Sequence, residues 1–369
     1  MLYYVLVIIS AALGTYLLCF PVRKVAHLTV RNELRSRDVH TKPIPRFGGL
    51  AMLMGFVIAL LVASCMPYFN QTYEDGFQLS SIIVASILIS VVGVIDDMFN
   101  IDWMIKLAGQ IIAASIVTVN GVQIMSLPIG GLTIGSNRIS MVLTVIVIVA
   151  VINAINFIDG LDGLAAGVVG IGAISFFYYA FSLSGTHYNY AFLACLITAT
   201  LIGICVGFLP HNFHPAKIFM GDTGSQLLGL LMVSSSLLIT GKIDAADANI
   251  HSIPAFMPIF LPLLVCLLPI SDMLLAIVRR LLKGKSPTSP DRGHLHHKIL
   301  NLGHSHQTAV IILYIWAIFF AFGSFLFIYL RGRVAFIILL VAFIAITTWT
   351  ASPKLFIKPI FEQDDDTEE

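Results

Sequence analysis

Long uninterrupted apolar runs constrain this chain more than any other feature. Eleven runs of near-spanning length are spread along its 369 residues, and about 17–25 residues suffice for an α-helix to cross a bilayer. The runs are approximately 2–21, 47–67, 79–95, 104–120, 140–157, 163–184, 190–209, 223–241, 253–278, 308–330 and 334–350. Charged residues make up only 11% of the chain, against about 25% in soluble domains. We therefore expect an all-α polytopic membrane protein with about eleven transmembrane helices.

The basic residues predict how these spans are oriented. Loops on the cytoplasmic side carry an excess of Lys and Arg. Two loops, 21–46 and 279–298, are rich in both and fall on the same side of the predicted membrane. Only four of the 21 basic residues lie on the opposite loops, namely Arg138, Lys242, Arg331 and Arg333. The pattern predicts an outside N-terminus, a cytoplasmic C-terminus, a single transmembrane domain at 1–350 and an acidic, disordered cytoplasmic tail at 351–369.

Aspartates gather at the predicted cytoplasmic ends of the spans. The seven are Asp96, Asp97, Asp159, Asp162, Asp222, Asp272 and Asp291. Solvation of helix ends would explain one or two of them, but not seven beside glycine-rich turns. Carboxylates that repel one another need a cation, and hard oxygen ligands suit Mg²⁺ or Mn²⁺. We expect these acids to converge on one membrane face around such an ion.

Amide and basic side chains accompany the acids. Asn153 and Asn156 are three residues apart, so their amides share a helix face and can orient acids or ligand oxygens. The candidates for neutralising phosphate are Lys42, Arg46, Lys106 and Lys217. For Arg46, simple anchoring at the membrane surface is an equally good interpretation. A phosphate-binding role is favoured for Lys106, which follows the Asp96–Asp97 pair closely.

A histidine-rich loop follows the ninth run, with the sequence DRGHLHH at 291–297. Structural zinc sites prefer wider spacings that include sulfur ligands, and none are present here. An imidazole that contacts phosphate or a nucleotide fits a basic cytoplasmic loop better. His304 and His306 are expected on the loop surface.

These stretches together resemble the polyprenyl-phosphate N-acetylhexosamine-1-phosphate transferases. The resemblance covers about residues 20–305 and rests on DD at 96–97 with Lys106, NAINFIDGLDGL, KIFMGDTGS, PISD…RR and DRGHLHH, in that order. The HLHH stretch is similar to the bacterial branch that begins teichoic acid, O-antigen or arabinogalactan linker synthesis. The longer histidine motif with a following acid, typical of phospho-MurNAc-pentapeptide translocase, is absent from the sequence.

The resemblance implies a reaction and its partners. A Mg²⁺- or Mn²⁺-dependent enzyme of the bacterial cytoplasmic membrane would transfer GlcNAc 1-phosphate from UDP-GlcNAc to undecaprenyl or decaprenyl phosphate and release UMP. Other UDP-N-acetylhexosamines remain open as donors. Membrane lipid would surround the protein, a homodimer is expected, and nucleic acid is not expected as a partner.

The resemblance also implies roles for individual residues. Asp222 would hold the metal against the diphosphate, while Asp96 and Asp97 would bind or deprotonate the lipid phosphate or help to hold the metal. The family leaves open which of the two does which; Asp97 is expected as the second metal ligand. The implied substrate contacts are uracil for Lys42 and Phe219, the nucleoside and its phosphates for Asn156, Asp159 and Asp162, and phosphate or sugar for His294, His296 and His297. Lys106, Asn153 and Arg292 complete the expected substrate-binding set, and His294 is expected to be catalytic.

A proton- or ion-coupled transporter is the alternative from another functional class. Transporters place their ionisable groups near the bilayer midplane. In this sequence the middles of the apolar runs are almost free of charge, and the acids lie at their ends. A structural scaffold would not explain the clustered acids, so an enzyme is favoured.

Overall fold

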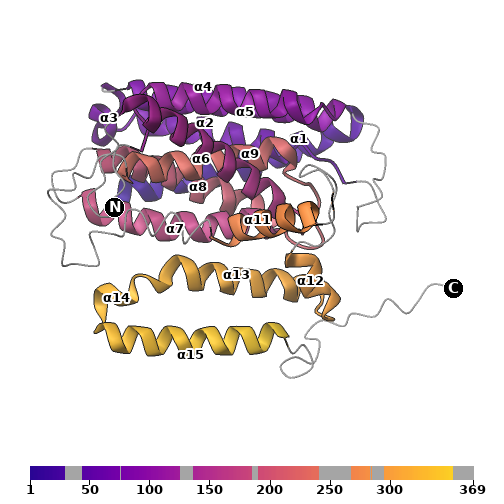
Figure 1. The fold of residues 1–369 in the computed structure, drawn as a ribbon. Coiled ribbons are helices and arrows are strands. Elements are labelled where there is room, and N and C mark those ends of the chain that lie inside the picture. Colours follow the sequence, from indigo (N-terminus) through magenta and orange to yellow (C-terminus); the bar gives the residue numbers. More distant parts are fainter. Residues whose placement is uncertain are drawn as a thin grey trace.

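The computed structural model describes residues 1–29, 44–74, 76–124, 136–184, 190–240, 267–282, 284 and 295–351. Every regular element within these residues is helical, and most of the long helices run roughly parallel or antiparallel to one another (Figure 1). The elements are α1 (Leu2–Thr29), α2 (Gly48–Ser64), η1 (Pro67–Phe69), α3 (Asn70–Glu74), α4 (Phe77–Phe99), α5 (Trp103–Val119), α6 (Asn137–Ile158), α7 (Leu164–Ser184), α8 (Tyr190–Asn212), α9 (Gly221–Thr240), α11 (Leu267–Leu282), α12 (Leu295–Asn301), α13 (His306–Gly323), α14 (Leu326–Tyr329) and α15 (Gly332–Ala351).

Eight of the described helices are long and apolar enough to cross a membrane, which makes this a multi-pass membrane protein. They are α1, α4, α6, α7, α8, α9, α13 and α15. A ninth span is present if α2 and the η1–α3 segment, which meet at 96°, are counted as one bent span. Helix α5 is apolar but has only 17 residues. Part of the run expected at 253–278 lies outside the described residues, and α11 covers its end.

Helix α9 occupies the centre of the bundle, where it packs on α2, α4, α6 and α8. Small residues allow these close approaches. A Cβ added to Gly49 on α2 would lie 2.1 Å from the Gly224 nitrogen, and one added to Gly93 on α4 would lie 2.4 Å from the Thr223 Cα. These contacts bring the N-terminus of α9 against α2 and α4.

Helices α13 and α15 form a separate layer beside the main bundle (Figure 1). Helix α13 packs on α7 and α15. The close fit at α7 depends on Gly167, where a Cβ would lie 2.1 Å from the Tyr314 hydroxyl. The histidine-rich segment expected as a loop contains the short helix α12, which packs on α13.

Several residues predicted from the sequence are not covered by the structure. Lys42, Asp291, Arg292 and His294 lie outside the described residues, as does the acidic tail from residue 352 onward. His296 and His297 lie on α12, but their side chains are not described. Their expected roles therefore remain predictions.

Candidate active site

The N-terminus of α9 is held by a carboxylate from another helix. Asp97, on the last turn of α4, accepts hydrogen bonds from the Asp222 backbone N–H at 2.9 Å and the Thr223 backbone N–H at 3.1 Å. Its Oδ2 also accepts from the Thr223 hydroxyl at 2.8 Å. The first N–H groups of a helix have no partner within the helix and carry a partial positive charge. Asp97 therefore caps α9 across the helix interface and orients the backbone that carries Asp222.

Gly221 makes this approach possible. Its φ of +67° lies in the left-handed region, which L side chains rarely adopt. A Cβ at this position would lie 2.2 Å from the Arg46 carbonyl oxygen and 2.5 Å from Asp97 Oδ2. A side chain would therefore separate the start of α9 from Asp97.

A lysine joins two carboxylates next to this cap. The Lys106 ammonium on α5 donates to Oδ2 of Asp222 and lies 3.3 Å from Oδ2 of Asp96. Asp96 and Asp97 are neighbours on α4, yet their side chains have different partners. Asp96 faces the ammonium and Asp97 faces the α9 backbone.

Amide side chains complete the polar cluster. Asn156 on α6 donates at 2.8 Å both to Oδ1 of Asp222 and to the Ser225 hydroxyl. Deeper in the bundle, Asn153 donates at 2.7 Å to Gln110, which approaches Gln226 at 3.4 Å. Of the predicted pair of amides, Asn156 contacts Asp222, whereas Asn153 is hydrogen-bonded to Gln110.

Asp159 ends α6 beside the same acids. Its pKa is raised to about 7, first by burial and then by the negative charges of Asp222 and Asp97, while Arg46 opposes the shift. Burial and the neighbouring negative charges thus favour the protonated form of Asp159. A cation or a basic substrate group next to these acids would favour its ionised form.

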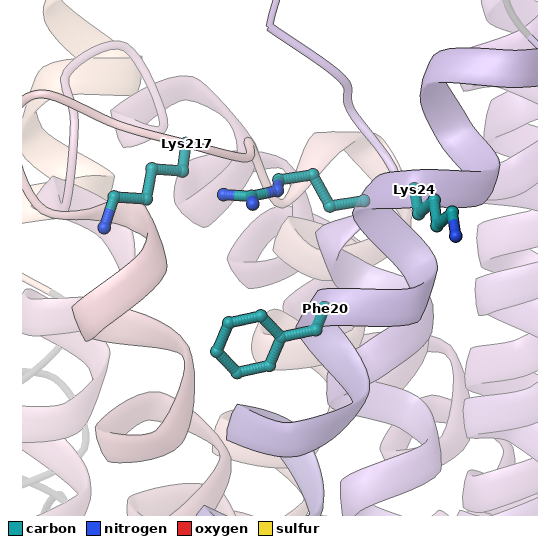
Figure 2. A pocket seen from close by; sticks show the side chains of 4 residues that line it. Phe20, Lys24 and Lys217 are labelled. Atoms are coloured by element: carbon teal, nitrogen blue, oxygen red, sulfur yellow. The ribbon is translucent and has the colours of Figure 1, made fainter.

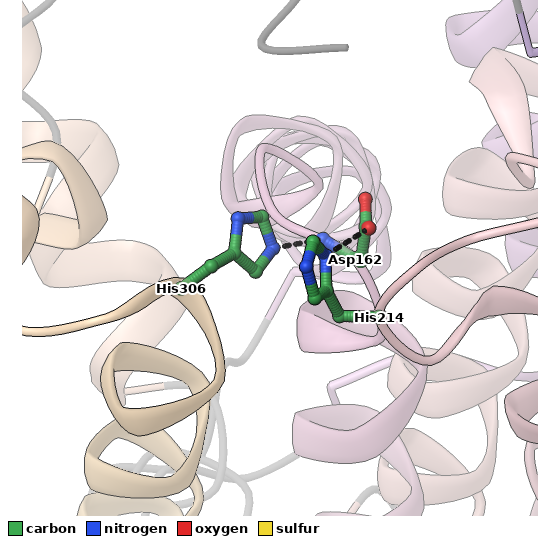
Figure 3. A group of neighbouring side chains, drawn as sticks. All are labelled: Asp162, His214 and His306. Atoms are coloured by element: carbon green, nitrogen blue, oxygen red, sulfur yellow. Dashed lines mark hydrogen bonds and ion pairs between the residues drawn. The ribbon is translucent and has the colours of Figure 1, made fainter. Parts of the chain in front are cut away.

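Asp162 belongs to a different group of side chains (Figure 3). Its Oδ2 lies 2.9 Å from His214 Nδ1 and accepts from the Ala216 backbone N–H at 3.1 Å. Its own backbone N–H donates to His306 Nε2 at 3.1 Å, and the two imidazoles stack with their centroids 4.5 Å apart. Through its carboxylate Asp162 ties the 159–163 turn to the loop before α9, and through its backbone N–H it ties this turn to the start of α13.

The expectation that His304 and His306 lie on a loop surface was wrong. His304 is 8% exposed and its ring lies 3.0 Å from the Thr350 carbonyl oxygen of α15. His306 is partly buried in the group around Asp162. Both histidines belong to the packing of α13, which a polar stretch of sequence does not reveal.

Asn212, which the sequence analysis did not single out, connects two site loops. Its Oδ1 accepts from the Gly163 backbone N–H at 3.0 Å, and its Nδ2 donates to the Ile218 carbonyl at 3.0 Å. The loop containing Phe219 is further held by a hydrogen bond from Phe219 N–H to the Pro45 carbonyl at 2.8 Å. Amides within or just after apolar segments, such as Gln110 and Asn212, were the available sequence signal, because polar groups that become buried there need partners.

Asp272 and Lys217 are placed by the structure on other elements than the acidic cluster. Asp272 is 1% exposed on α11, a helix that packs on α6. Lys217 is exposed on the loop between α8 and α9 and lines a cavity with residues of α1. The structure brings Asp96, Asp97 and Asp222 together through their hydrogen bonds, and Asp159 lies close enough to feel the charges of Asp222 and Asp97.

The donor set of the cluster fits a hard divalent cation. Asp222 and Asp96 present carboxylate oxygens to one shared ammonium, and amide groups stand beside them. Mg²⁺ characteristically binds one or two carboxylates and completes its shell with water and substrate phosphate. Both Asp97 oxygens accept hydrogen bonds from α9. This favours Asp96 over Asp97 as the partner of Asp222.

Comparison with known proteins places these residues in one family. The sequence pattern of glycosyl transferase family 4 matches residues 79–240, which include the α4, α5, α6 and α9 parts of the cluster. The decaprenyl-phosphate N-acetylglucosaminephosphotransferase of Mycobacterium tuberculosis is 39% identical over 358 residues, covering 95% of this chain and 89% of the relative. The chain belongs to glycosyl transferase family 4.

Other members of the family align over a similar extent. The probable undecaprenyl-phosphate N-acetylglucosaminyl 1-phosphate transferase of Bacillus subtilis is 31% identical and covers 93% of this chain and 89% of its own length. The undecaprenyl-phosphate α-N-acetylglucosaminyl 1-phosphate transferase of Yersinia pestis is 28% identical, covering 80% of this chain and 76% of the relative. The resemblance inferred from the motifs is thereby confirmed.

Proposed function

We propose that this protein transfers GlcNAc 1-phosphate from UDP-GlcNAc to a polyprenyl phosphate of a bacterial cytoplasmic membrane, undecaprenyl or decaprenyl phosphate, and releases UMP. The observation that carries the proposal is the group formed by Asp222, Lys106 and Asp96 at the N-terminus of α9. It lies at the ends of apolar spans, where a lipid phosphate and a soluble nucleotide sugar can meet. The relatives named above carry the same activity in their names.

The reaction moves one phosphoryl group between two phosphate oxygens. An oxygen of the lipid phosphate forms a bond to the phosphorus that carries GlcNAc, and the bond from that phosphorus to the oxygen of UMP breaks. Such a transfer needs mainly positioning and charge neutralisation. Mg²⁺ or Mn²⁺, when bound, supplies electrostatic stabilisation of the diphosphate, and Asp222 with Asp96 would hold it.

The remaining residues of the cluster have supporting roles in this proposal. Lys106 is available to a substrate phosphate once the carboxylates bind the cation. Asn156 keeps Asp222 oriented through its 2.8 Å hydrogen bond. Asp97 acts as a positioning residue through the α9 backbone, in place of the base or metal-ligand role expected from the sequence.

The nucleoside end of the donor is assigned to the loops beside the cluster. Phe219 and Asp159 belong to these loops and remain candidates for contacts with uridine. Asp162 is engaged with His214 and Ala216, so its part is to hold the loops in place. Lys42, Arg292, His294, His296 and His297 stay as proposed contacts to uracil, phosphate or sugar.

Release of UMP by the purified protein tests the proposal directly. We expect UMP to appear only when UDP-GlcNAc, undecaprenyl or decaprenyl phosphate and Mg²⁺ or Mn²⁺ are all present. Running the two lipids and UDP-GalNAc in parallel identifies the acceptor length and the sugar. Absence of UMP with both lipids, together with ion flux through reconstituted protein, would support the transporter alternative.

We also propose eleven spans with the N-terminus outside and the acidic cluster in the cytoplasm. Cys65 is exposed, so labelling should start from a Cys65→Ser background. In sealed right-side-out cells we expect an impermeant maleimide to label an Asn189→Cys variant but not a Ser289→Cys variant. Labelling of the Ser289→Cys variant from outside would reverse the orientation.

A further inference from the structure

A basic cavity lies apart from the acidic cluster, between α1 and the loop that precedes α9. It has a volume of about 480 Å³ and is lined by Phe20, Arg23, Lys24 and Lys217. Figure 2 shows Lys217 on the loop, with Phe20 and Lys24 projecting from α1. Three of the four lining side chains are cationic, and the described lining contains no acid.

Within the described residues, these three cations form no ion pair. The ion pairs found there join Lys106 to Asp96 and Asp222, and His214 to Asp162. Like charges gathered in one cavity repel one another, and the repulsion is relieved when an anion binds between them. A phosphate group suits this place, because guanidinium and ammonium groups make charge-assisted hydrogen bonds to its oxygens.

The surface of α1 below the cavity indicates what kind of molecule carries that phosphate. Leu13, Leu17 and Phe20 are 55%, 59% and 46% exposed, and with Lys24 they follow one another at helical spacing on one face. This face belongs to a helix apolar enough to span the membrane. An acyl chain can therefore lie along the leucines while its headgroup reaches the cations, with an aromatic ring at the boundary.

The loop that carries Lys217 is firmly placed. The Lys217 backbone N–H donates to the His211 carbonyl at 2.8 Å, and the neighbouring Ala216 and Ile218 side chains are buried. The His211 ring packs against Phe20 with the centroids 4.8 Å apart. The cavity is thus lined by α1 and this loop, both of which contact His211 at the end of α8, whereas the acidic cluster lies on α4, α5, α6 and α9.

We propose that this cavity binds the phosphate of an anionic membrane phospholipid. Arg23 and Lys217 hold the phosphate from two sides, Lys24 adds positive charge at the rim, and the acyl chains lie on the exposed face of α1. None of the lining residues belongs to the acidic cluster proposed to bind the metal and the diphosphate. A bound lipid would join α1 to the loop that leads into Asp222.

Native mass spectrometry of the full chain in nonionic detergent tests this site. Phosphatidylglycerol and phosphatidylcholine are added in separate titrations. We expect the first phosphatidylglycerol molecule to bind at least tenfold more tightly than the first phosphatidylcholine molecule. An Arg23→Gln, Lys217→Gln double variant should lose this preference, to less than about twofold. A matched Arg331→Gln, Arg333→Gln variant should keep this preference. These two exposed arginines lie at the start of α15 and do not line the cavity.

Further experiments distinguish a lipid phosphate from a soluble phosphate as the ligand of this cavity. An Arg23→Lys, Lys217→Arg variant keeps the charges and should bind phosphatidylglycerol within threefold of wild type. Glycerol 1-phosphate should fail to displace the lipid at equal concentration; equal displacement would make this a site for soluble phosphate and overturn the proposal. The proposal would also be overturned if the Arg23→Gln, Lys217→Gln variant kept its preference for phosphatidylglycerol. The same holds if this variant lost only its binding of undecaprenyl phosphate. None of these outcomes depends on UMP release, so the transferase proposal is tested separately.

Discussion

Replacing Asp97 by Asn distinguishes a positioning role from a direct role in the chemistry. The wild-type carboxylate accepts three hydrogen bonds from Asp222 and Thr223 at 2.8–3.1 Å. Asn presents only one oxygen, and its NH₂ group faces an N–H donor of α9. Loss of one bond to a charged acceptor costs about 1.5–3 kcal/mol, and loss of the charge at a helix N-terminus adds up to about 1 kcal/mol.

We therefore expect the Asp97→Asn variant to lose about 2–4 kcal/mol of stability in detergent. The start of α9 should shift, and a displacement of about 1 Å at a reacting centre can lower turnover about 10²-fold. Unfolding midpoints and kcat should thus fall together. A Thr223→Val variant should lose less stability, and the double variant should lose less than the sum, because both substitutions remove parts of one interaction.

Asp102 provides the matched control. It caps α5 through a 2.8 Å bond from the Met104 backbone N–H and is exposed. Asn caps a helix about as well as Asp, so Asp102→Asn should change stability and kcat little. The positioning role would be refuted if Asp97→Asn left the unfolding midpoint unchanged while kcat fell and its pH dependence flattened, as loss of a general base predicts. An unchanged midpoint with a large rise in the Mg²⁺ needed for half-maximal activity would instead make Asp97 a metal ligand.

Further predictions concern the neighbouring acids. Asp222→Asn should abolish UMP release while the protein stays monodisperse, because an amide keeps the shape of the side chain but lacks the charge that a divalent cation requires; activity within a few-fold of wild type would exclude the metal role. Asp159 has a folded-state pKa of about 7, above the ordinary value of about 3.9, so between these values the folded protein binds more protons and loses stability as pH rises. Asp159→Asn should therefore unfold at a higher temperature than wild type at pH 8 and gain less at pH 5, as measured by thermal unfolding in detergent; an equal gain at both pH values would contradict the shift.

The sequence alone determined the class of the protein and most of the chemistry of its site. Charged residues are costly inside a bilayer, so apolar runs with acids at their ends are visible without a structure. The proximity of Asp96, Asp97 and Asp222 was expected from their predicted common side and from the family resemblance. That Asn156 and Lys106 lie next to these acids was expected in the same way.

The sequence could not assign different partners to neighbouring or closely spaced acids. Asp96 contacts Lys106 while Asp97 caps α9, and Asp159 lies beside the cluster while Asp162 binds His214. Nor did a polar stretch reveal that His306 packs against Asp162. Each of these outcomes depends on residues that are far apart along the chain.

Tertiary packing decided these assignments, because the direction of a side chain depends on how its helix is rotated and how closely its neighbour approaches. On α4, successive residues point about 100° apart, so two adjacent aspartates reach different groups at the start of α9: Asp97 reaches the backbone N–H groups, and Asp96 reaches the Lys106 ammonium beside Asp222. The contact of Gly93 with Thr223 and that of Gly49 with Gly224 set this rotation and approach. Those contacts are non-local, which is why motifs identified the acids but the bundle selected the role of each.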